Sequence, residues 1–282
     1  MTSYRHYILS ACLLLFPFYA TAQTQPPEPR PTITPDPKDK TDESAAAKKV
    51  DPELILELGA AYEFLSKGKP DWQTYYLFFN RKFSSGQTLY GSASAVRRFN
   101  VTDANLMIGL VQPLTASKRW IATFEAAGSP NHQVLPTVSV FAQLERNFGK
   151  GWLGHAGLRH TRYPSDTVNM GVFGVERYFK AYRGSYNLYV AHLNGKGTAA
   201  SHIFRGDHYY GERNSVGLGF AFGQEIESVG AGQVLRTDVL DFSLIGRHWL
   251  DKKWGLSYVG VWHRQGTLYT RSGAQIGVLM RF

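Results

Sequence analysis

Residues 270–282 read Thr-Arg-Ser-Gly-Ala-Gln-Ile-Gly-Val-Leu-Met-Arg-Phe. Side chains alternate between the two faces of a β-strand, so every second residue of this stretch shares one wall. The apolar wall comprises Ala274, Ile276, Val278, Met280 and Phe282, and the other wall comprises Arg271, Gly273, Gln275, Gly277, Leu279 and Arg281. In a secreted chain this alternation is typical of the closing strand of an outer-membrane β-barrel, with lipid outside and a polar lumen inside. A half-buried edge strand of a soluble sandwich gives the same pattern, so other features must decide.

The first residues have the layout of a secretory signal peptide. A basic pair at positions 5–6 precedes a largely apolar stretch at 7–19, and Ala20-Thr21-Ala22 supplies the small residues that signal peptidase prefers. A lipoprotein cleavage box ending at Cys12 is also present, but most of the apolar core follows that cysteine instead of preceding it. We therefore expect residues 1–22 to be a cleaved signal peptide.

Composition excludes several classes of site. Cys12 is the only cysteine, so the mature chain is expected to have no disulfide and no thiolate nucleophile, and we expect no metal site and no cofactor. The net charge of +9 is spread over short basic runs near the ends of expected strands, such as Lys252-Lys253. Such runs favour solvated ends or contacts with anionic lipid head groups over nucleic-acid binding.

Two regions follow the signal. Residues 23–51 are rich in proline and charge and lack a periodic apolar face, which predicts a disordered periplasmic linker. Residues 52–282 consist of alternating segments separated by turn residues, which predicts a single β domain. No run of about eighteen apolar residues occurs after the signal, so no transmembrane helix is expected, whereas membrane strands remain compatible with this hydropathy.

Strand length distinguishes a membrane barrel from a soluble sheet. The clearest alternating segments lie at 54–64, 74–83, 106–110, 120–125, 137–147, 216–225, 240–247 and 254–263. Many run about nine to thirteen residues, which matches a tilted membrane strand better than a soluble one. Aromatic residues gather at segment ends, among them Trp72, Trp120, Trp152 and Trp254, as interfacial girdles require.

The linkers between segments alternate in length. Tight turns are expected at 84–86, 149–151 and 250–253, and longer loops at 128–136, 194–200 and 224–236. Short periplasmic turns and longer outer loops predict an even strand number and periplasmic N- and C-termini. We predict an all-β fold, a closed antiparallel transmembrane β-barrel of about fourteen strands, or of twelve if the poorly alternating region 198–213 is a loop.

Several short pieces together resemble the YaiO family of outer-membrane β-barrel proteins: residues 157–163, 174–176, 186–192, 214–216 and 277–282. The resemblance covers most of residues 52–282 in order. It implies insertion by the general barrel-assembly machinery, which reads the last strand and Phe282 as an assembly signal. Because relatives often occur beside envelope-polysaccharide components, it also implies traffic or anchoring of glycans. The family offers no catalytic residues to carry over, and this chain lacks the fused repeat region of some relatives.

Assigning the polar face of each segment inward gives a lumen of mixed charge. Its candidates are Glu57, Glu63, Lys82, Arg98, Glu125, Glu145, Arg159, Glu225, Asp241, Arg247 and Arg281. Such residues commonly brace opposite walls through ion pairs and hydrogen bonds. Alternatively they line a narrow polar conduit or a sugar-binding lumen, where Tyr76, Tyr90 and Tyr189 would meet hydroxyl groups.

The sequence offers little support for catalysis. His155 and His160 are five residues apart on one strand and should lie on opposite faces. His202, Asp207 and His208 fall in a loop-like stretch with Ser201 and Ser215 nearby, but no Gly-x-Ser-x-Gly turn is present.

Paired carboxylates are a further catalytic arrangement, and Glu125 and Glu145 could pair across adjacent strands.

We assign no catalytic residue. The expected function is a non-enzymatic outer-membrane barrel, a channel or docking element for polysaccharide export. Its expected partners are outer-membrane lipids and lipopolysaccharide, the barrel-assembly machinery, and envelope polysaccharide or its export components. The alternatives are a barrel enzyme that modifies lipid or glycan and a soluble secreted all-β binding protein.

Overall fold

The computed structural model describes residues 51–228 and 234–282, which form fourteen β-strands. The strands are β1 (Glu53–Leu65), β2 (Trp72–Lys82), β3 (Thr88–Arg98), β4 (Val101–Pro113), β5 (Trp120–Gly128), β6 (Val138–Gly149), β7 (Trp152–Arg162), β8 (Thr167–Phe179), β9 (Tyr182–Leu193), β10 (Gly197–Tyr210), β11 (Asn214–Ser228), β12 (Val234–Trp249), β13 (Trp254–Gln265) and β14 (Tyr269–Arg281). The expected signal peptide, and the expected linker except for its last residue, lie outside the described residues. No helix long and apolar enough to cross a membrane occurs in the described part of the chain.

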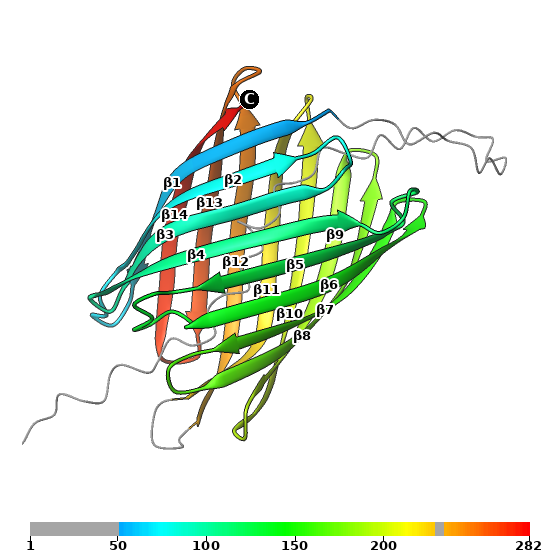
Figure 1. The fold of residues 1–282 in the computed structure, drawn as a ribbon. Helices are drawn as coiled ribbons and strands as arrows, with labels where there is room; N and C mark the ends of the chain where they lie inside the picture. The colour runs from blue at the N-terminus through cyan, green and yellow to red at the C-terminus, as the bar shows by residue number, and fades with distance from the viewer. Residues whose placement is uncertain (1–50, 229–233) are drawn as a thin grey trace, which may run out of the picture.

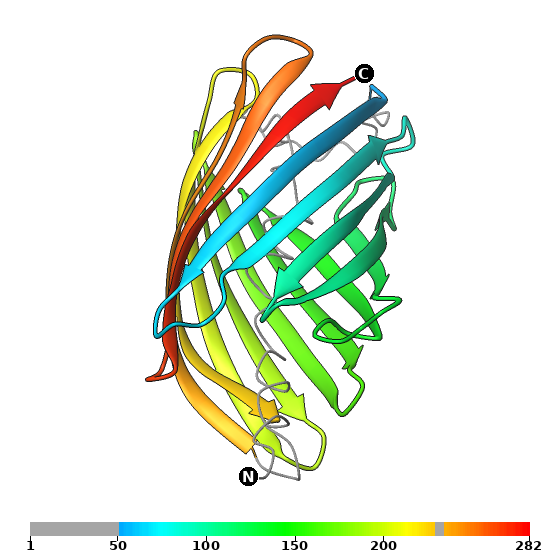
Figure 2. The same cartoon turned by 90° about the vertical axis from the view of Figure 1, so that its left-hand side faces the viewer.

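The sheet closes on itself. Each strand pairs with its sequence neighbours, and β1 pairs antiparallel with β14 from Ile55 opposite Arg281 to Leu65 opposite Arg271. Figures 1 and 2 show the tilted strands around the wall, with β1 beside β14 and the C-terminus at the end where β1 begins. Closure leaves no strand with unpaired backbone groups, and a sheet in lipid must have no such edge. The predicted closed barrel of fourteen strands is confirmed, and the twelve-strand alternative is wrong.

Alternation gives the barrel an apolar outer wall and a polar inner wall. Along β14, Ile276 and Val278 are exposed, whereas Gln275 and Leu279 are buried. On β1, Leu58 is 67% exposed between the buried Glu57 and the partly buried Gly59. Exposed apolar side chains over a whole wall are favourable only against lipid.

The expected loops at 194–200 and 224–236 are largely strand where the structure describes them, and residues 229–233 lie outside the described residues. β10 begins at Gly197, β11 extends to Ser228 and β12 begins at Val234, so those two predictions were wrong. The outer face of β10 carries His202 and His208, and its inner face carries Ile203, which obscures the hydropathy period. The expected long loop at 128–136 does exist, because residues 129–137 join β5 to β6.

Candidate functional site

The inner wall carries all eleven charged residues that the alternation places in the lumen. Glu57, Glu63, Arg98, Glu125 and Asp241 are buried, and Lys82, Glu145, Arg159, Glu225, Arg247 and Arg281 are partly buried at inward positions of their strands. They do not form one cluster. Most enter separate networks of hydrogen bonds and ion pairs, each spanning neighbouring strands.

The first network lies at the β1–β14 seam and centres on Glu57. Glu57 Oε1 accepts hydrogen bonds from the Tyr76 hydroxyl at 2.7 Å and the Ser257 hydroxyl at 2.6 Å. Gln275 Nε2 donates to the Tyr76 oxygen at 2.9 Å, and Arg247 Nη2 lies 3.9 Å from Glu57 Oε2. The network therefore joins β1, β2, β12, β13 and β14 across the closing seam.

Glycines leave room for these side chains. A Cβ on Gly59 would overlap the Tyr76 ring, and a Cβ on Gly109 would overlap the ring of Tyr90. A side chain in a strand normally stands over its neighbours, so a glycine beside a large ring permits that ring to lie across the wall. These inner glycines make the networks sterically possible.

The second network centres on Glu125 of β5. Glu125 accepts from the Tyr90 hydroxyl at 2.9 Å, and its other oxygen lies 2.6 Å from Arg159 Nη2. The Arg159 guanidinium also lies 4.6 Å from the centre of the Phe141 ring and donates to the Ser139 hydroxyl at 3.4 Å. A charge-assisted hydrogen bond inside a largely enclosed wall holds both charged groups in place.

The third network was not predicted from the sequence. Arg183 of β9 makes a bidentate pair with Glu176 of β8, at 2.7 and 2.9 Å, and lies 3.4 Å from Asp207 of β10. Arg205 binds the same Asp207 at 2.8 Å. Asp207 and Arg205 lie in the stretch expected as a loop, which is why alternation did not assign them to the wall.

The end of the barrel away from the C-terminus has its own cluster around Trp72. The guanidinium groups of Arg98 and Arg271 lie 4.4 and 4.8 Å from the Trp72 ring centre. Arg271 also pairs with Glu63 at 3.2 Å. These contacts stabilise the cations on an aromatic face.

The long β5–β6 connection is fastened to the same end of the barrel by Asp103 of β4. Its fully buried carboxylate accepts three backbone hydrogen bonds, from Gln133 at 3.0 Å, Val134 at 2.7 Å and Leu135 at 2.8 Å. The Asn131 side chain adds a bond to the backbone carbonyl of Thr102 at 2.9 Å. Because Asp103 is an inward residue, this connection lies against the inner side of the wall at the mouth.

The candidate catalytic groups are kept apart. His155 faces inward and contacts Asn187 at 2.9 Å, whereas His160 is exposed on the outer wall, which confirms their opposite faces. His202 and His208 face outward on β10 and Asp207 faces inward, so they do not form the constellation considered from sequence.

The carboxylate pair is also absent. Glu125 stands opposite Phe141 and Glu145 stands opposite Ile121, so the pairing of Glu125 with Glu145 that was considered from the sequence does not occur. Across residues 51–228 and 234–282, no three histidine, cysteine, aspartate or glutamate side chains gather as metal ligands do.

Comparison with known proteins agrees with this architecture. The model of the YaiO membrane beta barrel domain matches residues 55–227, more than half of the chain. The chain belongs to the YaiO family. This YaiO-family barrel is accordingly an outer-membrane protein, as the resemblance implied. No curated protein matches its sequence significantly.

Among solved structures, the YaiO-family barrel is similar to several porins. The anion-selective porin from Comamonas acidovorans has 10% identity and a TM-score of 0.46, with 82% of this chain and 99% of that chain covered. The KdgM porin in complex with disordered oligogalacturonate has 10% identity and a TM-score of 0.46, with 80% and 99% covered. Salmonella typhi OmpF in complex with daunomycin has 8% identity and a TM-score of 0.48, with 82% and 97% covered.

Proposed function

We propose that this barrel is a non-enzymatic passage for envelope polysaccharide during export. The observation that carries the proposal is the inner wall, where tyrosine hydroxyls and oppositely charged groups are bonded to one another. Glu125 and Arg159 neutralise each other, as do Glu176 and Arg183, so the wall is polar without a strong local charge of one sign. Such a wall suits a hydroxyl-rich chain, since a filter for ions of one sign needs unbalanced charge.

The proposal includes an orientation. The start of the first strand and the end of the last strand lie side by side at one mouth of the barrel, because Leu54 and Phe282 are hydrogen-bonded to each other. We place this mouth in the periplasm. A signal peptide at residues 1–22 would direct export, and the barrel-assembly machinery would read the β14 segment that ends at Phe282. Lipopolysaccharide would then surround the opposite mouth, and export components would meet the periplasmic one.

The connection held by Asp103 supports a narrow outer mouth. A buried carboxylate that accepts three backbone hydrogen bonds fixes the loop in one place. Such a loop would restrict the passage to a single extended chain and would exclude folded proteins.

A liposome-swelling assay tests the proposal. Vesicles that contain the purified barrel should swell in solutions of neutral oligosaccharides, and Asp103→Ala should admit larger sugars than the wild type. Asp238→Ala changes an exposed outer residue and serves as the matched control. Absence of swelling with every sugar, in the wild type and in Asp103→Ala, would contradict a passage.

Absence of enzymatic function belongs to the same proposal. On the inner wall the His155 ring contacts Asn187 at 2.9 Å, Glu176 lies on the neighbouring strand β8, and among the described residues no hydroxyl nucleophile is hydrogen-bonded to His155. Labelled lipopolysaccharide and glycan should therefore remain unchanged during incubation with the barrel. Turnover that disappears in His155→Ala would overturn this part.

A further inference from the structure

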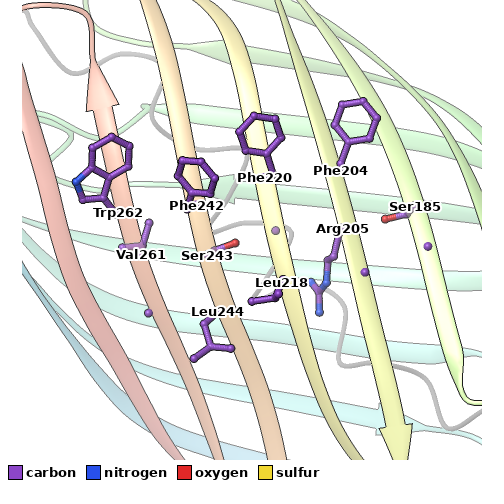
Figure 3. A pocket seen from close by; sticks show the side chains of 14 residues that line it. Ser185, Phe204, Arg205, Leu218, Phe220, Phe242, Ser243, Leu244, Val261 and Trp262 are labelled. Atoms are coloured by element: carbon purple, nitrogen blue, oxygen red, sulfur yellow. The ribbon is translucent and has the colours of Figure 1, made fainter.

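The outer wall over β9–β13 contains a hollow of about 770 Å³. Its middle is one cross-strand row of outward residues, in the order Gly184, Gly206, Leu218, Leu244 and Gly260, each directly opposite the next. Figure 3 shows Leu218 and Leu244 on neighbouring strands within this row. Three glycines in five positions lower the surface relative to the side chains around it.

The glycines leave empty space and do not accommodate a neighbouring ring. A Cβ built on Gly184, Gly206 or Gly260 meets no atom within 4 Å. This differs from the inner wall, where the glycines Gly59 and Gly109 lie under tyrosine rings. The hollow is therefore open to whatever surrounds the outer wall.

One side of the hollow is a row of aromatic rings. Phe204, Phe220, Phe242 and Trp262 stand directly opposite one another along β10–β13, and Figure 3 shows the four rings side by side. The centres of Phe220 and Phe242 are 5.0 Å apart, and those of Phe242 and Trp262 are 5.9 Å apart. Contiguous rings make a firm apolar rim.

The other side, toward the C-terminal end, carries a band of outward tyrosine and histidine side chains, here called the polar row: Tyr182, His208, Tyr210, His248 and Tyr258. The Tyr182 and His208 rings are stacked with centres 4.8 Å apart. His248 contacts the hydroxyl of Tyr210 at 2.6 Å and that of Tyr258 at 3.0 Å. Tyr182 is the first residue of β9 and Tyr210 the last residue of β10, so the polar row lies at the C-terminal end of the barrel wall. Tyrosine rings favour head-group level, which places the hollow just on the hydrocarbon side of that interface.

Basic side chains lie beyond the polar row. Lys252 and Lys253, in the turn between β12 and β13, are both exposed, and the Lys253 carbonyl accepts a hydrogen bond from the Arg281 amide of β14 at 2.8 Å. Exposed lysines near a membrane surface attract lipid phosphate. The order along the wall is thus cation, polar ring and open hollow, which matches the order phosphate, glycerol ester and acyl chain of one lipid.

We propose that this hollow binds one acyl chain of a glycerophospholipid whose head group lies on the polar row. The lipid belongs to the periplasmic leaflet of the outer membrane, an assignment that rests on the proposed orientation, in which the C-terminal end is periplasmic. A second copy of the barrel is the competing occupant. The phospholipid fits better because the cations and polar rings continue the hollow toward one interface, whereas a symmetric contact needs a matching apolar ridge.

Native mass spectrometry tests this directly. The full barrel is refolded into vesicles of phosphatidylethanolamine and phosphatidylglycerol, extracted in mild detergent and weighed. The hollow is filled by Gly206→Leu with Gly260→Leu, and the control places the same leucine side chains on the exposed outer face of β6 and β7 by Ala142→Leu with Ala156→Leu. Heat-modifiable gel migration checks that each variant is folded, and Gly184→Val fills the same hollow from β9 if the double variant fails.

We expect one retained phospholipid on the wild type and on the control, and about tenfold less on the filled variants, which have lost the dispersion contacts. Equal retention by filled and control variants would overturn the proposal, as would no retained lipid on the wild type. A wild-type dimer that the filled variants convert to monomer would assign the hollow to a second copy. None of these results depends on whether the barrel passes saccharide, so failure here and failure of the proposed function are distinguishable.

Discussion

The backbone amide of Phe282 donates a hydrogen bond to the Leu54 carbonyl at 2.9 Å, and the Leu54 amide donates to the Phe282 carbonyl at 3.3 Å. This reciprocal pair begins the seam where β14 meets β1. In an antiparallel ladder, hydrogen-bonded pairs recur at every second position, so Leu58 and Val278 form a pair of the same kind farther along. The seam is therefore a continuation of the sheet and not a packing contact.

Cysteines at Leu58 and Val278 should form a disulfide. Directly opposite residues in such a pair have Cα atoms about 5.5 Å apart, which disulfide geometry accepts. Oxidation should give a cyclised chain that migrates faster on a denaturing gel without reductant. Cysteines at Leu58 and Val140, on β1 and β6, are the matched control and should stay reduced. Efficient cross-linking of the control, or none at the seam, would contradict closure.

The aromatic ring of Phe282 should contribute to assembly. It is 57% exposed beside the seam, and Lys253 lies over it at 5.7 Å from the ring centre. An aromatic side chain at head-group level anchors a strand in the interface, so Phe282→Ala should slow insertion. Pulse-chase labelling should show delayed appearance of the heat-modifiable barrel, with Phe282→Tyr close to the wild type. Equal rates for alanine and wild type would remove Phe282 as an assembly signal.

Much of this fold could be predicted from a single sequence, because the alternation of side chains between the two faces of a strand depends only on neighbouring residues. The outward set from Ala274 to Phe282 and the inward Glu57 and Glu63 follow from counting by twos. The region 198–213 could not be assigned, because β10 places histidine and tyrosine rings on its outer wall. Such rings are favourable at the level of the lipid head groups, but their low hydropathy hides the alternation of apolar residues that marks a membrane strand.

The Glu125–Arg159 pair should stabilise the barrel. Glu125→Gln removes the carboxylate and leaves the largely enclosed Arg159 cation without its partner, which should cost about 2 kcal/mol. The urea midpoint of refolded protein in vesicles measures this loss. Glu212→Gln, at an exposed turn, should leave the midpoint unchanged. If Glu125→Gln with Arg159→Gln costs as much as the two single changes added together, the two residues are not coupled.

The pairs of the inner wall could not be predicted, for a physical reason. Alternation places Glu125 and Arg159 on the inner face, but their contact spans β5 and β7 across the intervening β6. It depends on the stagger between strands and on the space that Gly109 leaves for Tyr90. Register and stagger are set by the closed sheet as a whole. Arg183 and Glu176 were missed for a simpler reason, because their strands were not assigned residue by residue.

The turn between β12 and β13 should respond to pH. Asp251 accepts backbone hydrogen bonds from the amides of Trp254 and Lys253, each at 2.6 Å, and these bonds lower the pKa of its carboxyl. A lowered pKa stabilises the fold above the ordinary pKa of an aspartate, and this contribution is lost as pH falls through the lowered value. Asp251→Ala should therefore reduce the urea midpoint at about pH 6, and this reduction should shrink as the pH falls below the ordinary pKa of an aspartate, about 3.9. A reduction that stays constant over the whole acid range would show that the carboxylate charge plays no part.

Removing the Asp103 carboxylate should free the β5–β6 connection. Asp103→Ala leaves the amides of Gln133, Val134 and Leu135 without their acceptor, while Asp103→Asn retains one side-chain oxygen. Limited proteolysis should cut Asp103→Ala within residues 129–137 faster than the wild type, with Asp103→Asn between them. Unchanged cleavage would mean that other contacts hold the loop.

Planar-bilayer conductance of the refolded barrel tests the central claim most directly, because a polar passage must conduct ions before it can pass a saccharide. We predict discrete current steps for the wild type, larger steps for Asp103→Ala, and reversible blocking of both by neutral oligosaccharide on one side. A bilayer that contains correctly folded wild type and Asp103→Ala barrels yet shows no steps for either would contradict the claim.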